Sequence, residues 1–406
     1  MLASIYITQY IGVAFIMSAA MAILRQQGVA LDKLALLNLA ALPMVGKIFY
    51  APLIDKYRPH FQGQYRSWLL IAQGCMALML FIAGLMDLQQ HFNWLFLILA
   101  IYVFFMSIQD VSVDGLSCKL VDADSRKMAS SVQFSGNLTG NIIGGGLILM
   151  FYPWLHWHGS LWLLAALTFF SLLQIVFFCE PEQNSYSAPQ TTVNKRLLVD
   201  AWDFIKQKKH WFIVMALYPI GSTCGFALLN PLLVDSGWTL DDIGFALKIY
   251  GSGIGLVSAL IATPVITYFG RMKALVMMSC LQAIALLFIV PLTLGYTDKL
   301  TVYLALTVHF ISFPALLVIS ATIMMDNAAD QARKATFFTL QFSFAALMGF
   351  IYSFISMALA KYIGYSAVVM SGVFVAFIIT FFIWLQEQSK PQTAVHCEAE
   401  RKIVER

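Results

Sequence analysis

The sequence predicts an all-α integral membrane protein in which twelve transmembrane helices form two pseudo-symmetric six-helix bundles. Three observations carry this prediction: an apolar composition, apolar runs of regular length and a weak internal repeat. Of the 406 residues, 60% are hydrophobic and only 11% are charged. A chain this apolar cannot cover itself with a water-compatible surface, so we expect a lipid bilayer to be its solvent.

Apolar runs long enough to cross a membrane recur along the whole chain. A hydrocarbon core about 30 Å thick requires about 20 helical residues. The twelve predicted spans are residues 3–24, 34–54, 67–87, 94–116, 128–151, 160–179, 211–234, 243–267, 273–294, 300–324, 335–359 and 364–386. The first run lacks a basic leading region and a small-residue cleavage site, so we expect a retained helix rather than a secretory signal.

A polar stretch divides the runs into two sets of six. Residues 180–210 are rich in Pro, Ser, Thr and charge, as is typical of a linker. We therefore predict an N-terminal bundle at 1–180, a cytoplasmic linker at 181–210, a C-terminal bundle at 211–387 and a cytoplasmic tail at 388–406. The later part of the linker is expected to form an amphipathic helix on the membrane surface.

The two sets of six share sequence. "SRKMASSVQFS" (125–135) matches "ARKATFFTLQFS" (332–343), and "LRQQGVALDKLALL" (24–37) matches "LVDSGWTLDDIGFA" (233–246) at nearly the same offset. The repeat indicates duplication, with parallel halves related by an axis along the membrane normal. Glycines in the fifth and eighth spans predict close packing between the two halves.

Basic residues indicate the orientation in the membrane. Most of the 25 Lys and Arg residues follow even-numbered spans or lie in the tail, whereas the opposite breaks hold Arg25, Lys33, Lys299 and Lys361. By the positive-inside rule, both termini are cytoplasmic. Membrane topology and contact with anionic lipid account for the net charge of +4, so we expect no nucleic-acid partner.

The fourth span contains Gln109, Asp110 and Asp114. The two carboxylates, four residues apart, lie on one helix face with Gln109 beside them. A charge at the bilayer centre costs at least about 2.5 kcal/mol, so such residues usually face a cavity, pair with a cation or bind protons. The functional interpretation is proton or substrate coupling. The alternative is that the span ends near Ile108 and leaves both carboxylates at the cytoplasmic interface, beside basic groups such as Lys119.

Lys47 is the natural partner of Asp110. It lies two turns above Asp55, at a depth close to that of Asp110. The pair is interpreted either as a structural brace or as a switch, in which protonation of Asp110 shifts the equilibrium between outward-open and inward-open states. His309, in mid-span, is a candidate titrating or ligand-binding group, with a buried histidine held by a neighbour as the alternative.

Other polar side chains within the spans are candidate substrate contacts. Lys248 either attracts an anionic solute or snorkels outward, and Tyr250 follows it. Asn137, Asn141 and Gln341 are expected to face the cavity or to form interhelical hydrogen bonds.

Catalytic and metal-binding signatures are not found. The six cysteines are scattered without metal-ligand spacing, so neither disulfides nor a metal site is expected. His156 and His158, flanked by Trp154 and Trp157, are typical of an aromatic belt. No P-loop or hydrolase motif is found, so we expect no catalytic residues, no cofactor and no ATP-driven transport.

The motif "APLIDKYRP" (51–59), with its echo "YFGRMKA" (268–274), resembles the Asp-plus-basic signature of the major facilitator superfamily. The resemblance implies the major facilitator fold. It also implies a cytoplasmic gate that locks and releases the halves. The predicted gate residues, which include basic residues of the internal repeat, are Asp55, Lys56, Arg58, Arg126, Lys127, Arg271, Lys273 and Arg333.

"GKIFYAPLIDKY" (46–57) and "QDVSVDGL" (109–116) are similar to AmpG-like permeases, a branch with importers of muropeptides and siderophores and transporters of acetyl-CoA. "LRQQGVALDKL", "MMDNAADQARKATFFTLQFS" and the twelve spans resemble most the siderophore importers of the RhtX/FptX type. The resemblance implies a monomeric, proton-coupled importer of a siderophore or ferric siderophore in a bacterial inner membrane. A muropeptide permease is the alternative.

Two other classes of protein are weighed against a transporter. A transporter-like sensor would bind its ligand and signal through residues 180–210 without net transport. A membrane-embedded enzyme would use the two carboxylates for acid/base chemistry, but no nucleophile or metal set accompanies them.

Overall fold

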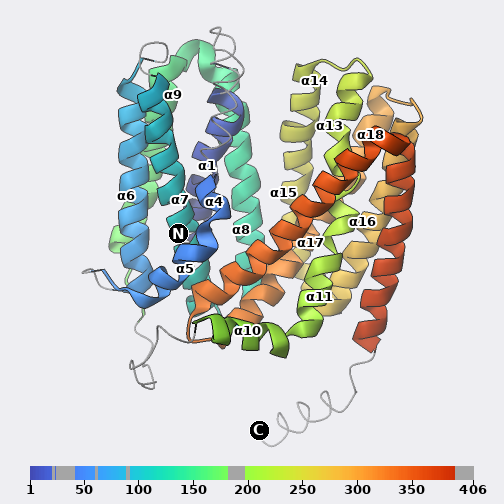
Figure 1. Ribbon diagram of the computed structural model, residues 1–406. Coiled ribbons are helices and arrows are strands. Elements are labelled where there is room, and N and C mark those ends of the chain that lie inside the picture. Colours follow the sequence, from blue (N-terminus) through green and yellow to red (C-terminus); the bar gives the residue numbers. More distant parts are fainter. Residues whose placement is uncertain (21–22, 24–41, 60–62, 88–91, 182–196, 389–406) are drawn as a thin grey trace, which may run out of the picture.

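The chain folds into two helical bundles, with one helix lying across one end of the molecule (Figure 1). The computed structural model describes residues 1–20, 23, 42–59, 63–87, 92–181 and 197–388. The N-terminal bundle comprises α1 (Leu2–Ala14), η1 (Phe15–Ala20), α4 (Leu42–Val45), α5 (Lys47–Lys56), α6 (Gln64–Leu85), α7 (Phe92–Leu120), α8 (Arg126–Asn141), η2 (Ile142–Leu147) and α9 (Ile148–Phe177). The η elements are π-helical turns.

The helix across the end is α10 (Leu197–Gln207), so the expected amphipathic helix of the linker is present. The C-terminal bundle comprises α11 (Lys209–Leu217), α12 (Pro219–Thr223), α13 (Phe226–Asp235), α14 (Leu240–Gly244), η3 (Phe245–Tyr250), α15 (Gly251–Phe269), α16 (Arg271–Thr293), α17 (Lys299–Ala329) and α18 (Lys334–Gln388). Residues 182–196 of the linker, the tail beyond Gln388 and the repeat segment 24–37 lie outside the described residues.

Nine helical stretches among the described residues are long and apolar enough to cross a bilayer. One of them, Arg126–Phe177, contains the fifth and sixth predicted spans, which are separated by non-helical backbone at His156 (φ 50°, ψ −167°). A similar break at Gly364 (φ 80°) separates the last two spans within α18. The described parts of the first two predicted spans are shorter, so the total of twelve stays a prediction.

The surface of the bundles is rich in large apolar side chains. Trp154, Phe177, Phe354 and Phe374 are each more than two-thirds exposed. Extended apolar surface is rare on proteins surrounded by water, whereas lipid tails solvate it without cost. The fold is therefore that of an all-α protein that spans a membrane.

The two halves pack together most closely toward the end where α10 lies, which we call the α10 end. There α8 packs on α15 and α17, and the first part of α18 packs on α5 and α7. Cys118 and Phe134 of the N-terminal half share a core with Met325 and Phe338 of the C-terminal half. Side chains near this end are thus held in positions that depend on both halves.

The predicted role of the glycines in the fifth span holds only for Gly146, where a Cβ atom would lie 3.4 Å from Ile249 of the other half. A Cβ atom at Gly144 would lie 1.9 Å from the carbonyl oxygen of Ile11, and those at Gly136 and Gly140 would meet Tyr6 and Tyr10. These glycines therefore bring α8 and η2 against α1 within the same half. Of the glycines in the eighth span, Gly255 fits the prediction, because its Cβ would lie 3.2 Å from Leu138 of the other half.

Candidate functional site

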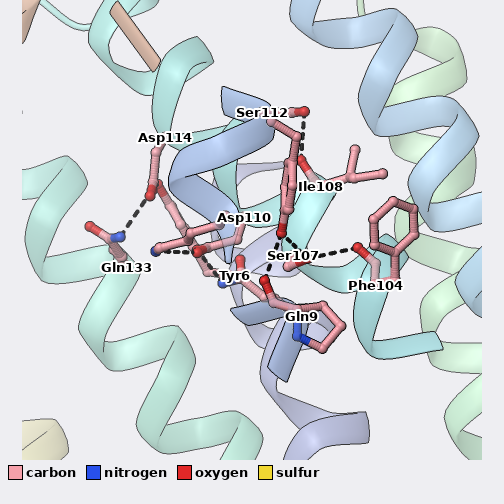
Figure 2. Close-up of polar contacts among 12 residues, drawn as sticks. Tyr6, Gln9, Phe104, Ser107, Ile108, Asp110, Ser112, Asp114 and Gln133 are labelled. Carbon is pink, nitrogen blue, oxygen red and sulfur yellow. Dashed lines mark hydrogen bonds and ion pairs between the residues drawn. The ribbon is translucent and has the colours of Figure 1, made fainter. Parts of the chain in front are cut away.

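Gln109, Asp110 and Asp114 form a buried polar group on α7. Their exposed fractions are 0%, 6% and 1%. Because α7 continues without a break to Leu120, Asp110 lies about 15 Å and Asp114 about 9 Å from the α10 end of the helix, at 1.5 Å per residue. Helix α7 thus does not end near Ile108 and both carboxylates are buried inside the protein, while their depth in a membrane stays a prediction. Figure 2 shows Tyr6 and Gln9 of α1 and Gln133 of α8 beside these carboxylates, and Asp110 also contacts Lys47 of α5.

Asp110 forms an ion pair with Lys47. The Lys47 Nζ atom lies 2.6 Å from Asp110 Oδ2, and the two side chains are 8% and 9% exposed. Gln9 of α1 donates its Nε2–H to Asp110 Oδ1 at 2.5 Å. The ion pair predicted from the sequence is thus present. The two opposite charges compensate each other. A buried ion needs such a partner because it has lost its contact with water.

The same ammonium group contacts the opposite half. Lys47 Nζ lies 4.3 Å from the centroid of the Phe342 ring of α18, within the range of a cation–π interaction. Lys47 therefore lies between a carboxylate of one half and an aromatic face of the other. Any movement of the halves that separates α5 from α18 must break this contact.

Asp114 is buried without such a cation. Its Oδ1 atom accepts hydrogen bonds from Tyr6 Oη and Gln133 Nε2, both at 3.0 Å, and Tyr6 Oη also lies 3.1 Å from Ser117 Oγ. Among the described residues, no Lys or Arg forms an ion pair with Asp114. A carboxyl group held only by neutral donors can take up a proton without leaving a cation unpaired.

Gln109 serves a different purpose from the carboxylates. Its Nε2 atom donates to the Ile5 carbonyl oxygen at 2.9 Å and so ties α7 to α1. Its Oε1 atom has no hydrogen-bond partner within the described part of the chain. The amide therefore acts first as an interhelical contact.

A cavity of about 290 Å³ lies against the Phe342 ring. Aromatic rings of both halves line it, among them Phe134 of α8 and Phe313 of α17, together with hydroxyl groups such as those of Ser222 and Ser320. Phe134 and Phe342 occupy equivalent positions in the internal repeat, each following the Gln of "QFS". The repeat thus places one aromatic ring from each half on the wall of a shared cavity.

His309 belongs to a neutral cluster in the C-terminal half. Its Nδ1 atom lies 2.8 Å from Gln282 Nε2, and Ser312 Oγ donates to Gln282 Oε1 at 2.5 Å. The Phe226 ring stacks on the imidazole, with centroids 4.3 Å apart. His309 Nε2 has no partner among the described residues. The histidine is held by neighbours, as the alternative interpretation supposed, and its proposed titration stays a prediction.

Four of the five candidate substrate contacts lie on α8 and η3. Asn141 Nδ2 donates to Asn137 Oδ1 at 2.8 Å, so these amides bind one another on α8. Tyr250 Oη lies 2.7 Å from Thr307 Oγ1, and the Lys248 side chain is exposed.

Gln341 is buried and its amide is already occupied. Its Oε1 atom accepts from Trp211 Nε1 at 2.9 Å and from Asn327 Nδ2 at 3.3 Å. Its Nε2 atom donates to the backbone oxygens of Met324 and Phe337. It therefore braces α11, α17 and α18, and substrate binding by any of these five residues stays a prediction.

Asp55, at the α10 end of α5, binds the first turn of α18 in the opposite half. Its Oδ2 atom accepts from the backbone N–H of Thr336 at 2.7 Å and from Thr336 Oγ1 at 2.6 Å. Its Oδ1 atom accepts from Tyr65 Oη at 2.6 Å. A carboxylate at a helix N-terminus satisfies N–H groups that lack partners within the helix and complements the helix dipole. The contact links the two halves without a cation.

A second link between the halves centres on Asp326 of α17, which the sequence analysis missed as a site residue. Asp326 Oδ1 accepts from Arg126 Nη1 of α8 at 2.9 Å and from Arg271 Nη2 of α16 at 3.2 Å. Arg271 Nη2 also donates to the Ala123 carbonyl oxygen at 2.6 Å. One carboxylate thus organises two of the predicted basic gate residues. An acidic residue near the end of a span, preceding the repeated Arg-Lys pair, was the available signal.

The remaining predicted gate residues are Lys56, Arg58, Lys127, Lys273 and Arg333. Lys127 contributes its backbone carbonyl oxygen, which accepts from Thr263 Oγ1 of the other half at 3.3 Å. The Lys56 ammonium lies 5.0 Å from the Tyr57 ring centroid. Arg58 and Lys273 have exposed side chains. The part of these five residues in a gate stays a prediction.

No metal-binding cluster of three or more His, Cys, Asp or Glu side chains lies within the described residues. His158 Nδ1 lies 2.5 Å from the Gly84 carbonyl oxygen, and the His158 ring packs beside Trp162. Trp154 is exposed, as an aromatic belt requires, whereas Trp157 is buried and donates to the Ala83 carbonyl oxygen at 3.2 Å, so the belt stays a prediction.

Comparison with known proteins identifies the family of this chain. Residues 2–353 match the model of the Major Facilitator Superfamily. The chain therefore belongs to this superfamily of membrane transporters. The structure of the human organic anion transporter MFSD10 has the same fold, with a TM-score of 0.71 at 12% identity, covering 94% of this chain and 97% of that one.

Curated relatives lie in the AmpG branch. The anhydromuropeptide permease of Escherichia coli strain K12 is 24% identical over 260 residues, which are 63% of this chain and 52% of the permease. The match thus spans about half of that relative's length. A Rickettsia prowazekii protein named "Putative transporter AmpG 3" is 24% identical over 357 residues, covering 82% of this chain and 83% of that protein.

Proposed function

We propose that this protein is a proton-coupled permease that imports muropeptides or similar peptidoglycan fragments across a bacterial inner membrane. The observation that carries the proposal is the buried Lys47–Asp110 pair inside an AmpG-like chain. The relatives named above favour this cargo over the siderophore expected from the sequence motifs, because the E. coli relative is named for anhydromuropeptide. Siderophore import becomes the competing hypothesis.

The contacts between the halves support a transporter that is closed at its α10 end. Asp55 holds the first turn of α18, and Asp326 holds Arg126 and Arg271. By the positive-inside rule this end faces the cytoplasm, with both termini on that side. The conformation is therefore one in which the cytoplasmic gate is shut, and release of cargo requires these contacts to break.

The two carboxylates of α7 support the proposal of proton coupling. Protonation of Asp110 removes the charge that Lys47 neutralises, so the ion pair loses its Coulomb energy and the balance between the open states changes. Asp114, held by the neutral donors Tyr6 and Gln133, is the second group able to carry a proton. Both lie on the same face of α7, one turn apart.

Phe342 connects this charge site to the cargo cavity. One face of its ring contacts the Lys47 ammonium, and the ring also lines the 290 Å³ cavity. Cargo that displaces the ring removes the cation–π contact and leaves Lys47 to Asp110 alone. Cargo binding and the state of the ion pair are thereby linked through one side chain of the C-terminal half.

The test is uptake by the full chain reconstituted in proteoliposomes under an imposed pH gradient. Radiolabelled anhydromuropeptide is supplied in one arm and a panel of radioiron-loaded siderophores in the other. We expect anhydromuropeptide uptake that disappears when the gradient is collapsed and in Asp110→Asn. Asp298→Asn, an exposed N-cap of α17, is the matched control and retains uptake.

Each outcome discriminates between hypotheses. Uptake of a siderophore alone would restore the first hypothesis for the cargo. Anhydromuropeptide uptake that does not respond to the gradient would keep the cargo and contradict proton coupling. Binding without flux of either compound would favour a sensor and overturn the proposal.

A further inference from the structure

A second cavity, distinct from the one beside Phe342, lies at the α10 end of the C-terminal half. Its volume is about 690 Å³. It is enclosed by the junction of α10 and α11, by α16 and α17, and by the last turns of α18. We call it the interfacial cavity, because its lining includes residues close to where α11 begins at Lys209 and α18 ends at Gln388. Figure 1 shows α10 at the same end of the bundle.

The cavity has one polar and one apolar side. Val214, Ile323 and Phe382 form part of the apolar wall, and they lie deeper along their helices than the polar residues. Trp211 lines it as well, with its indole N–H fixed 2.9 Å from Gln341 Oε1. An occupant of this cavity needs an apolar part that reaches into the membrane and a polar part that stays at its surface.

The polar side carries both signs of charge. Lys208 and His210 contribute a cation and an imidazole from the α10–α11 junction, and Glu387 contributes a carboxylate from the last turn of α18. None of these three side chains forms an ion pair or side-chain hydrogen bond with another described residue. The charged groups therefore surround the cavity without satisfying one another.

We propose that the interfacial cavity binds a phospholipid with an ethanolamine headgroup. The phosphate accepts from Lys208 and His210, the primary ammonium donates to Glu387, and an acyl chain covers the apolar wall. Charge-assisted hydrogen bonds of both kinds require a headgroup that carries a phosphate and an N–H donor. A choline headgroup has no N–H to donate, and a glycerol headgroup has no cation for Glu387.

The test measures lipid binding to the detergent-purified, delipidated full chain by native mass spectrometry. Palmitoyl-oleoyl phosphatidylethanolamine is titrated beside the phosphatidylcholine and phosphatidylglycerol of the same chains. We expect phosphatidylethanolamine to bind most tightly, and Lys208→Gln and Glu387→Gln each to weaken it about fivefold, as the loss of one charge-assisted hydrogen bond at a partly exposed site predicts. Glu387→Gln should also abolish the preference over phosphatidylcholine.

Matched controls make the same charge change outside the cavity. Lys209→Gln neighbours Lys208, and Asp203→Asn lies on the exposed face of α10. Both should bind phosphatidylethanolamine like the unaltered chain. Because the readout is lipid binding, the result does not depend on the proposed cargo.

Four results would overturn the proposal. The first is equal affinity for the three lipids, and the second is equal weakening by the cavity and control variants. The third is displacement of the lipid by millimolar inorganic phosphate, which would identify a free anion as the ligand. If a chain ending at Gln388 instead bound phosphatidylethanolamine about tenfold more tightly, residues 389–406 would be the natural occupant.

Discussion

The centres of the two halves differ in charge although the halves share one architecture. The N-terminal half buries an ion pair, Lys47–Asp110, together with Asp114. The C-terminal half buries His309, Gln282 and Ser312, which are joined by hydrogen bonds and covered by an aromatic ring. Burying an ion costs far more than burying a hydrogen-bonded amide or imidazole. The groups that are most costly to bury therefore lie in the N-terminal half. A change in their protonation should change the free energy of the protein more than a change at the neutral centre of the C-terminal half.

Equivalent positions of the repeat show how the halves diverged. Gln133 and Gln341 both precede the cavity-lining phenylalanine, but Gln133 donates to the Asp114 carboxylate, whereas the Gln341 oxygen accepts from Trp211. The same amide thus serves a titratable group in one half and fixes a helix junction in the other. We infer that changes of protonation occur in the N-terminal half, and that aromatic side chains of both halves contact the cargo.

The largest expected effect comes from breaking the ion pair on one side. Lys47→Met leaves the Asp110 charge buried and uncompensated, which should cost about 3 kcal/mol of stability, whereas Lys47→Met with Asp110→Leu should recover most of it. Thermal unfolding in detergent, followed by size-exclusion chromatography, compares the two. Equal unfolding temperatures for the single and double variants would show that the unpaired Asp110 charge is not what destabilises the single variant.

A smaller effect is expected at the contact between the halves. Asp326→Asn weakens the links to Arg126 and Arg271, whose side chains are partly exposed, so the α10 end should open about threefold more often. Ser130→Cys, in a chain otherwise free of cysteine, reports opening as a faster maleimide reaction, because Ser130 is fully buried in the closed contact. Asp330→Asn, an exposed acid nearby, is the control, and equal rates in both variants would contradict a gate at Asp326.

The smallest effect should be at the neutral centre. His309→Gln keeps a hydrogen-bonding group beside Gln282, so cargo uptake should fall by no more than about threefold, with its pH dependence unchanged. The measurement is a pH profile of uptake in proteoliposomes. A loss as complete as that expected for Asp110→Asn would place a coupling group in the C-terminal half as well.

The sequence predicted the fold and the ion pair for physical reasons that are local. Apolar runs of membrane length specify spans, and the depths of Lys47 and Asp110 follow from helical rise. The partner of Gly136, Gly140 and Gly144 was misassigned, because small residues indicate close approach of helices but do not name the partner. Asp326 was missed because its role depends on its contacts with Arg126 and Arg271, which come from other helices.

By itself, then, the sequence determined the membrane-spanning class, the duplicated halves and the buried charges, because composition, length and periodicity are properties of each segment alone. The tertiary structure decided that Phe342 covers Lys47, that Asp55 binds the first turn of α18 and that charges of both signs surround the interfacial cavity. These contacts join residues up to 295 positions apart (Lys47 and Phe342), and only the packing of helices against one another brings such segments together.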